Sequence, residues 1–356
     1  MQGKYLTNLL RAKETGLIVV ILALGTLLSI FGGTVTQRVR DPETGRVTGQ
    51  VQVNKFLQPM NIDIILKNSS WTAVMAVGAT MLIISGGIDL SIGGIYCLAA
   101  VCGAMFLRWL GPSGNYPDAS PLWVVPTAIA VTMLVGMLCG LTNGLMVVLL
   151  KVHPFIITLG TMSIFRGIAF VSTQAQAVTD YPEVFGQMFR HTMGDFTLLP
   201  IAMVVMVGLA GYVFLQFTVS GRSAYAVGGN ETASMYSGIR VSRVKVLVFA
   251  WAGLAGGIAA VITLGTFGSA DSSTGRGYEL DVIAAAVVGG ASLSGGRGTA
   301  LGAVLGAIVI QLIANGIVIL EIDQNYTEII KGAVIILAVV MDRVSTAMNE
   351  RRLVRA

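Results

Sequence analysis

Residues 71–107 read WTAVMAVGATMLIISGGIDLSIGGIYCLAAVCGAMFL, and Asp89 is the only charged residue in this run. Its surroundings are Ser85-Gly86-Gly87-Ile88-Asp89-Leu90-Ser91-Ile92-Gly93-Gly94. A carboxylate at membrane depth costs about 2.5–3.5 kcal/mol on insertion scales, so it marks a functional site or a polar cavity. The glycines predict a break in a helix, which lipid tolerates only where protein or water covers the exposed backbone.

The composition indicates an integral membrane protein. The chain has 356 residues, of which 54% are hydrophobic and 12% charged, whereas a soluble domain has about 25% charged residues. The net charge of +5 reflects the placement of loops relative to the membrane, so we expect no nucleic-acid partner.

The apolar runs predict an all-α polytopic membrane protein, with residues 1–356 forming one transmembrane domain. About ten segments are expected, at residues 16–33, 70–84, 93–110, 122–150, 155–173, 197–217, 243–267, 280–294, 298–320 and 328–343. The first is expected to be an uncleaved span rather than a signal peptide. Segments 70–84 and 280–294 are short, which predicts broken or re-entrant helices.

The distribution of basic residues sets the orientation. Ten crossings place both termini on one side, where thirteen Lys and Arg residues fall against eight on the other. Because the basic side faces the cytoplasm, both termini are predicted to be cytoplasmic.

Residues 34–69 form the longest predicted outer loop. Alternating residues flank Pro42-Glu43-Thr44-Gly45, which predicts a β-hairpin on the outer face of the membrane.

Glycine spacing indicates close helix packing. The two ladders are Gly136, Gly140, Gly144 and Gly298, Gly302, Gly306. Such spacing lets helices approach closely in lipid. Asn143-Gly144 and Asn315-Gly316 precede apolar runs in segments that cross in opposite directions. We therefore predict two inverted halves, near 70–173 and 243–343, a pattern typical of transporters.

Residues 218–242 form a predicted cytoplasmic loop. Asn230 is a suitable N-cap for a short helix over residues 231–237, and Gly238 is suited to end it. The loop is either a simple linker or a docking element for a cytoplasmic partner. A short capped helix favours docking.

No cofactor or metal site is expected. Cys97, Cys102 and Cys139 fall in apolar runs without metal-ligand spacing, and His153 and His191 are far apart. Leu293-Ser294-Gly295-Gly296-Arg297 is similar to an ATPase signature loop, but the chain has no phosphate-binding Gly-x-x-x-x-Gly-Lys segment. We expect a tight turn there and no nucleotide binding.

Four motifs occur in an order that resembles a known family. They are residues 86–91, Thr158-Leu159-Gly160-Thr161-Met162 with Arg166-Gly167, Gly228-Gly229-Asn230-Glu231 with Ser237-Gly238-Ile239, and residues 283–290. Over residues 56–343 the chain resembles the ribose/xylose-type permeases of ABC sugar importers.

The resemblance implies a transport subunit of the bacterial inner membrane, without catalytic residues, that serves monosaccharide import. It implies a second permease subunit, identical or homologous, and a cytoplasmic ABC ATPase docked on residues 221–240. A periplasmic sugar-binding protein is expected at the outer loops. Two features depart from the pattern: the segment 38–50, and Ser234-Met235 after Ala233.

The candidate site residues form two groups. The group expected at the pathway or helix break contains Gly86, Gly87, Asp89, Ser91, Asn143, Arg166 and Asn315. The group expected to contact the ATPase contains Arg222, Gly228, Asn230, Glu231, Ala233, Gly238 and Ile239.

Three roles are open for Asp89: a structural cap, a pathway residue or an ion-coupling group. Arg166 either pairs with Asp89 or reaches the interface. Two further functions stay open for the chain, a secondary transporter or channel that works alone through Asp89, and a branched-chain amino-acid ABC permease.

Overall fold

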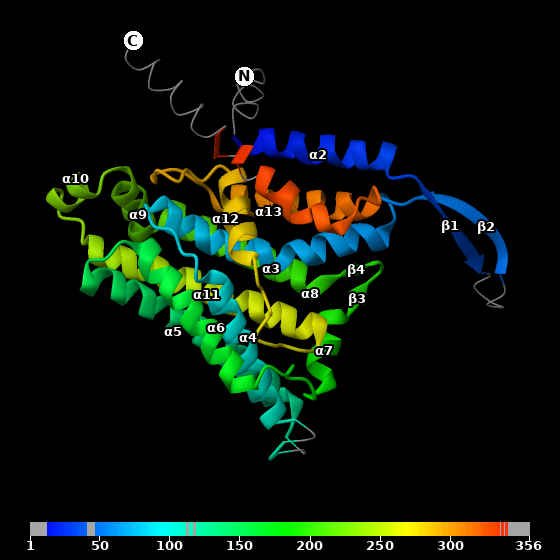
Figure 1. Cartoon of the computed structure of the whole chain (residues 1–356), viewed down its shortest axis with the longest axis horizontal. Coiled ribbons are helices and arrows are strands. Elements are labelled where there is room, and N and C mark those ends of the chain that lie inside the picture. The colour runs from blue at the N-terminus through cyan, green and yellow to red at the C-terminus, as the bar shows by residue number, and fades with distance from the viewer. Residues whose placement is uncertain are drawn as a thin grey trace, which may run out of the picture.

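The computed structural model describes residues 13–40, 47–111, 114–116, 119–334, 336–337 and 339–340. Long helices run between two ends of the molecule (Figure 1). They are α2 (Lys13–Phe31), α3 (Pro59–Ile84), α4 (Ile92–Trp109), α5 (Pro121–Leu150), α6 (Pro154–Thr173), α8 (Leu198–Phe217), α11 (Val241–Phe267) and α13 (Ala300–Ile319). Seven helices of the described part, α2, α4, α5, α6, α8, α11 and α13, are long and apolar enough to span a membrane. These spans confirm a polytopic α-helical membrane protein.

Short elements distinguish the two ends. The hairpin end carries β1 (Thr34–Arg40), β2 (Val47–Asn54), α7 (Glu183–Arg190), β3 (Thr192–Met193), β4 (Phe196–Thr197) and the 3-10 turn Gln324–Tyr326. The α9–α10 end carries α9 (Val219–Gly229) and α10 (Glu231–Tyr236) (Figure 1).

The hairpin predicted near Pro42 is present. β1 and β2 pair antiparallel, with Val35 opposite Val53. The predicted turn at residues 41–46 lies outside the described residues, as do both chain termini and the end of the segment 328–343.

The expected short span 70–84 is wrong. α3 begins at Pro59 and has 26 residues, which span about 39 Å at 1.5 Å per residue. The first turns were missed because Asp63 and Lys67 lower their hydropathy. Asp63 is nonetheless buried and satisfied, since it accepts hydrogen bonds from the Thr197 nitrogen (2.6 Å) and hydroxyl (2.8 Å).

The expected short segment 280–294 is confirmed as a short helix. α12 (Tyr278–Val288) has 11 residues, or about 16 Å, roughly half of a hydrocarbon core of about 30 Å. The non-helical segment 268–277, in which residues 272–277 form turns, precedes it and joins it to α11.

The first glycine ladder works as predicted. Gly136, Gly140 and Gly144 of α5 lie against the backbone of α11, and Gly253 on α11 faces Gly140 in return. A Cβ on Gly140 would lie 2.8 Å from the Gly253 Cα. The two helices therefore approach each other backbone to backbone.

The second ladder is partly wrong. Gly302 and Gly306 pack against the α12 end, at Gly289 and Ala285. Gly298 lies outside the helix, because α13 begins at Ala300 and Gly298 has a φ of +151°. Gly298 is part of the turn that enters α13.

The helix contacts support two inverted halves. α5 packs against α4 and α11, while α13 packs against α12 and α3. Exchanging α3 with α11, α4 with α12 and α5 with α13 therefore converts one set of neighbours into the other. α3 and α11 also contact each other, as expected for helices at the centre of such a repeat.

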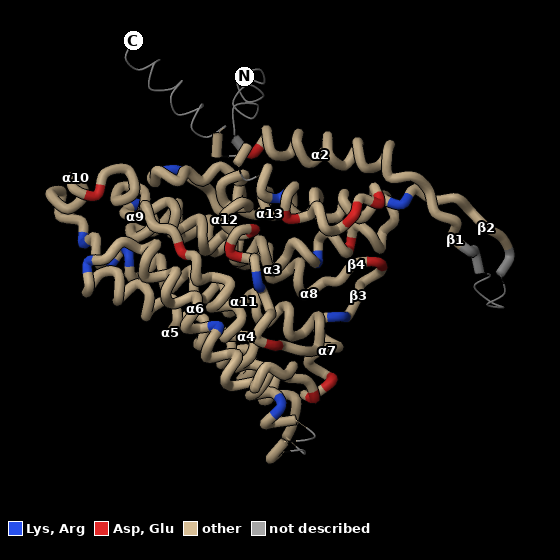
Figure 2. The backbone as a smooth tube through the Cα atoms, in the orientation of Figure 1, with Lys and Arg blue, Asp and Glu red and all other residues tan. Residues whose placement is uncertain are grey.

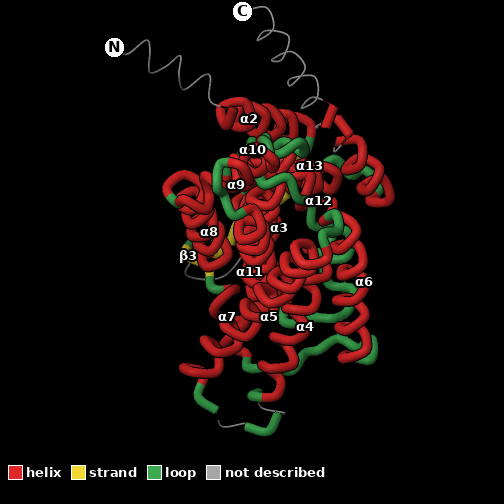
Figure 3. Tube along the Cα trace, turned by 90° about the vertical axis from the view of Figure 1, so that its left-hand side faces the viewer, coloured by secondary structure: helices red, strands yellow, loops and turns green. Residues whose placement is uncertain are grey.

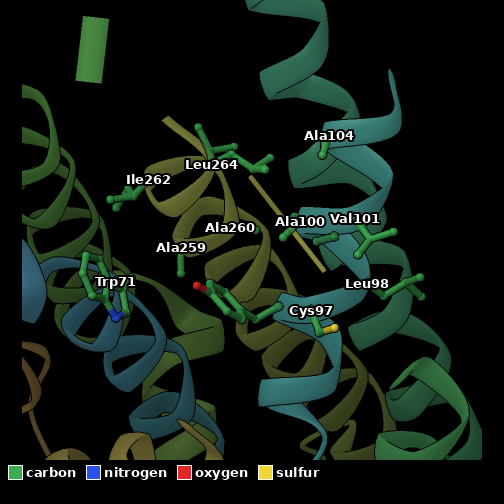
Figure 4. Close-up of a cluster of buried hydrophobic side chains, with 14 of the residues drawn as sticks. Trp71, Cys97, Leu98, Ala100, Val101, Ala104, Ala259, Ala260, Ile262 and Leu264 are labelled. Carbon is green, nitrogen blue, oxygen red and sulfur yellow. The ribbon is translucent and has the colours of Figure 1, made fainter. Parts of the chain in front are cut away.

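The larger core lies between α4 and α11. Figure 4 shows small side chains of α4, such as Ala100, facing Ala259 and Ala260 of α11, with Trp71 of α3 beside them. Cys97 and Cys139 are buried and Cys102 is half-buried, and none forms a disulfide. The cysteines are core residues, as the sequence predicted.

Candidate translocation and coupling site

The helix break predicted from the glycines is present. α3 ends at Ile84 and α4 begins at Ile92. Gly86 has a φ of +83°, a left-handed conformation that glycine adopts without steric cost. The Gly87 nitrogen donates to the Leu82 carbonyl at 3.0 Å, which closes the end of α3.

Asp89 holds the turn that restarts the helix. Its side chain is buried, and Oδ1 accepts hydrogen bonds from the Ser91 nitrogen (2.7 Å) and Ser91 hydroxyl (2.5 Å). Among the described residues, its Oδ2 has no hydrogen-bond partner. These bonds form an Asx turn before α4 and give Asp89 a structural contact, although the N-cap of α4 is Ser91, which makes no side-chain capping bond.

Neighbouring helices brace the break. On α5, the Asn143 amide donates to the Ser91 hydroxyl at 2.7 Å. On α6, the Thr158 hydroxyl accepts from the Leu90 nitrogen at 3.2 Å. Thr158 was not among the predicted site residues, although it lies in one of the four sequence motifs.

Arg166 does not pair with Asp89. Its guanidinium donates to the Gly275 carbonyl at 2.8 Å and lies 3.5 Å from the Glu279 carboxylate. It therefore fixes the non-helical segment before α12. Asn315 is also away from the break, since its amide donates to Asn61 of α3 at 2.8 Å.

A second turn of the same kind lies in the non-helical segment 268–277. Asp271 Oδ1 accepts from the Ser273 nitrogen (2.7 Å) and hydroxyl (2.6 Å). The segment follows α11, as the break with Asp89 follows α3. Asp271 was missed because its neighbours are polar, so its charge does not stand out in the sequence.

The predicted short helix in the loop 218–242 is present as α10. The Asn230 side chain accepts from the Ala233 nitrogen at 2.9 Å, which confirms Asn230 as the N-cap. Gly238 has a φ of +84° and follows the end of the helix. Glu231 forms an ion pair with Lys245 of α11 at 2.7 Å, and Arg222 donates to the Gln216 carbonyl at 3.4 Å.

Gly228 brings the loop against the break. A Cβ on Gly228 would meet the Ile84 carbonyl at the end of α3, and it would lie 2.7 Å from the Gly296 nitrogen. The Gly296 nitrogen in turn donates to the Ile84 carbonyl at 2.8 Å. Three chain segments, far apart in sequence, therefore meet through backbone atoms alone.

Side chains complete this junction. The Tyr225 hydroxyl of α9 donates to the Gly298 carbonyl at 2.7 Å. Burial raises the pKa of Tyr225, so the phenol keeps the proton that it donates. A cavity of about 100 Å³ lies between the break and the loop, lined by Gly86, Gly87 and His153 together with Glu231 and Lys245.

Residues 293–297 form the predicted tight turn. Gly295 and Gly296 have φ values of +84° and +72°. No three His, Cys, Asp or Glu side chains in the described ranges are placed to hold a metal ion.

Several basic residues gather at one end of the molecule. Figure 2 shows Lys and Arg gathered at the α9–α10 end, including those at the start of α11. The basic residues of the described chain there are Lys151, Arg222, Arg240, Arg243, Lys245 and Arg297.

Comparisons with known proteins place this geometry in context. A family described as branched-chain amino acid transport system / permease component matches residues 61–339. The chain is 38% identical over 296 residues to the ribose import permease protein RbsC of Bacillus subtilis, covering 82% of this chain and 87% of that protein. No solved structure matches the chain.

Two Escherichia coli proteins are also similar. The D-allose transport system permease protein AlsC is 34% identical, with 83% of this chain and 87% of that protein covered. The galactose/methyl galactoside import permease protein MglC is 33% identical, with 95% and 96% covered.

Proposed function

The chain belongs to the branched-chain amino acid transport system / permease component family, and on that premise we propose that it is the permease subunit of an ATP-driven monosaccharide importer. The similar proteins named above are import permeases for ribose, allose and galactose. The chain itself is a transport component rather than an enzyme, and its several apolar helices make it a multi-pass membrane protein.

The observation that carries the proposal is the backbone junction at Gly228. A permease driven by a separate ATPase needs a surface element that transmits motion to its spans. Here α10 begins three residues after Gly228, and Gly228 lies against both the end of α3 and the turn before α13. Movement of the α9–α10 loop would therefore act directly on the helix break that contains Asp89.

The charge distribution supports an orientation with the α9–α10 end in the cytoplasm. Six of the sixteen Lys and Arg residues of the described chain lie at this end (Figure 2), and cytoplasmic loops carry an excess of Lys and Arg. Both termini would then lie in the cytoplasm of a bacterial cell, and the hairpin end would face the periplasm.

With this orientation, each of three proposed partners can be assigned to a face of the chain. A cytoplasmic ABC ATPase would dock on α10, using the exposed Glu231, Gly238 and neighbouring residues. A periplasmic sugar-binding protein would dock at the hairpin end. A second permease subunit would complete the pathway, because the substrate path of such importers lies between two subunits.

The family description favours one second candidate, a branched-chain amino-acid importer. The sugar assignment is preferred because the similar curated proteins, matched over most of their length, carry sugar names.

Uptake in a deletion strain tests the assignment. Cells that lack the chain are complemented with it, and uptake of radiolabelled ribose, allose, galactose and leucine is measured. We expect the loss and recovery of one sugar with leucine unaffected. Recovery of leucine uptake alone would replace the sugar assignment by the amino-acid one.

Purification tests the architecture. The tagged chain is cross-linked in native membranes and its partners are identified by mass spectrometry. We expect an ATPase with a phosphate-binding loop and a periplasmic binding protein. Sugar uptake that persists without any ATPase partner would instead indicate a transporter that works alone.

A further inference from the structure

Four charged side chains form two ion pairs around the first turn of α12. Arg166 of α6 lies 3.5 Å from Glu279, and Lys331 of the helical segment 327–334 lies 2.8 Å from Asp281. Glu279 and Asp281 are both in the first turn of α12, where negative charge is favoured by the helix dipole. The two cations come from helices on either side of it.

These pairs lie near half of the membrane depth. The length of α12, from its first turn toward the α9–α10 end, is about 16 Å. The hydrocarbon core of a bilayer is about 30 Å thick, so the first turn lies near its middle. Arg166 is the thirteenth residue of the 20-residue α6, which puts its Cα about 18 Å along that helix. The bonds from Arg166 to the carbonyls of Thr274 and Gly275 place the non-helical segment 268–277 at the same level.

The pairs are mostly buried but reach the surface of the single chain. The side chains of Arg166 and Glu279 are 16% and 17% exposed, and those of Lys331 and Asp281 are 19% and 15% exposed. Figure 3 shows α6 and α12 on the same side of the molecule. Ser163, one turn before Arg166 on α6, is also exposed.

Contact between this surface and the hydrocarbon core of the bilayer would be unfavourable. A charge at the bilayer centre costs about 2.5–3.5 kcal/mol or more, and intramembrane charges therefore face protein or a water-filled cavity. The non-helical segment 268–277 has the same requirement, because non-helical backbone at this depth is tolerated only beside protein or water.

We propose that the surface around Arg166, Glu279, Asp281 and Lys331 lines a water-filled path for a polyhydroxy solute. This proposal rests on the proposed function, and it assigns the wall of the path to one face of the chain. Carboxylates accept and cations donate hydrogen bonds to sugar hydroxyls. Since each charge already has a partner within the wall, a passing sugar meets polar groups without a strong competing site.

Cysteine accessibility tests the proposal. Cys97, Cys102 and Cys139 are first replaced by Ala. Single variants Glu279→Cys and Lys331→Cys are then made in the assembled importer, in native membrane vesicles. Each is treated with a charged, membrane-impermeant thiosulfonate. Because the thiolate reacts and forms only where water reaches the sulfur, water access controls the rate.

Val205→Cys and Leu209→Cys on α8 are the matched controls. Both positions lie in the middle of their span and are 55% and 60% exposed on the isolated chain, and α8 carries no charged residue, so we expect them to face lipid. We expect residues 279 and 331 to react at least about tenfold faster than these controls, as thiolate chemistry requires water. Equal or slower labelling at 279 and 331 would overturn the proposal.

Ser163→Cys covers the possibility that loss of an ion pair prevents folding, because it leaves both pairs intact. It too should react faster than the α8 controls, and slow labelling would count against the path. Labelling is measured without transport. A chain that labels as expected but imports no sugar would therefore contradict the proposed function and leave the water-filled face supported.

Discussion

Asp89 and Asp271 make the same turn at the two helix breaks. Each carboxylate accepts hydrogen bonds from the nitrogen and the hydroxyl of the serine two residues later, Ser91 or Ser273. The breaks follow α3 and α11, which occupy corresponding positions in the two halves. The pair therefore supports the inverted repeat at the level of individual atoms.

Two substitutions of Asp89 distinguish the contribution of its charge from that of its hydrogen bonds. Asp89→Asn retains an acceptor for Ser91, so we expect most of the assembled protein to remain but uptake to fall, because charge-assisted bonds are about twice as strong. Asp89→Ala leaves the buried Ser91 donors without this acceptor and should lower the free energy of unfolding by about 1–3 kcal/mol. Thermal unfolding in detergent and sugar uptake measure the two effects. Asp89→Asn with wild-type uptake would remove the charge from the mechanism.

The backbone junction predicts different effects at two adjacent glycines. Gly228→Ala places a Cβ against Ile84 and Gly296, whereas Gly229 has no atoms within 4 Å of an added Cβ. We expect Gly228→Ala to separate ATP hydrolysis from uptake by displacing the loop from the break. Gly229→Ala should retain both activities and serves as the matched control. The ratio of ATP hydrolysed to sugar imported is the measurement, and equal ratios in both variants would refute the junction's role.

A charge swap tests the partner of Arg166. Arg166→Glu and Glu279→Arg should each reduce uptake strongly, because removing one member of a buried pair costs about 3–5 kcal/mol, and these partly exposed residues somewhat less. The double variant should recover part of the uptake. As a control, Arg166→Asp combined with Asp89→Arg should recover nothing, and recovery there would contradict the observed pairing.

The contact between α5 and α11 predicts overpacking. Gly140→Ala sets a Cβ against the backbone at Phe249 and Gly253, so we expect a loss of about 1–3 kcal/mol in unfolding free energy. Gly208→Ala on α8 is the control, since its Cβ would make an ordinary 3.5 Å contact with Val304. Thermal unfolding of the purified variants compares them, and similar stabilities would show that the helices can separate without cost.

The sequence predicted those features whose causes lie in a few consecutive residues. The glycines beside Asp89 predicted the helix break, Asn230 predicted the cap of α10, and alternating residues predicted the β-hairpin. In each case the chemical cause lies within a few residues of the effect, so no knowledge of packing was needed.

Features that depend on distant partners were missed. The start of α3 carries Asp63 and Lys67, and its place in a helix is evident only from Thr197, 134 residues away. The partner of Arg166 is 113 residues away, and nothing near Arg166 distinguishes Glu279 from Asp89. Asn315 resembled Asn143 in sequence, but Asn61 rather than the break receives its hydrogen bond.

The contact among Gly228, Ile84 and Gly296 is made by main-chain atoms, so its position depends strongly on the lengths of the connecting segments. A point substitution can block such a backbone contact, but it cannot shift the position at which the segments meet. A change of one residue in the length of the 289–299 connection would shift where the loop meets α3. The distance over which the loop moves the end of α3 is therefore set by the lengths of the connecting segments. Insertions or deletions are the changes that would alter this distance.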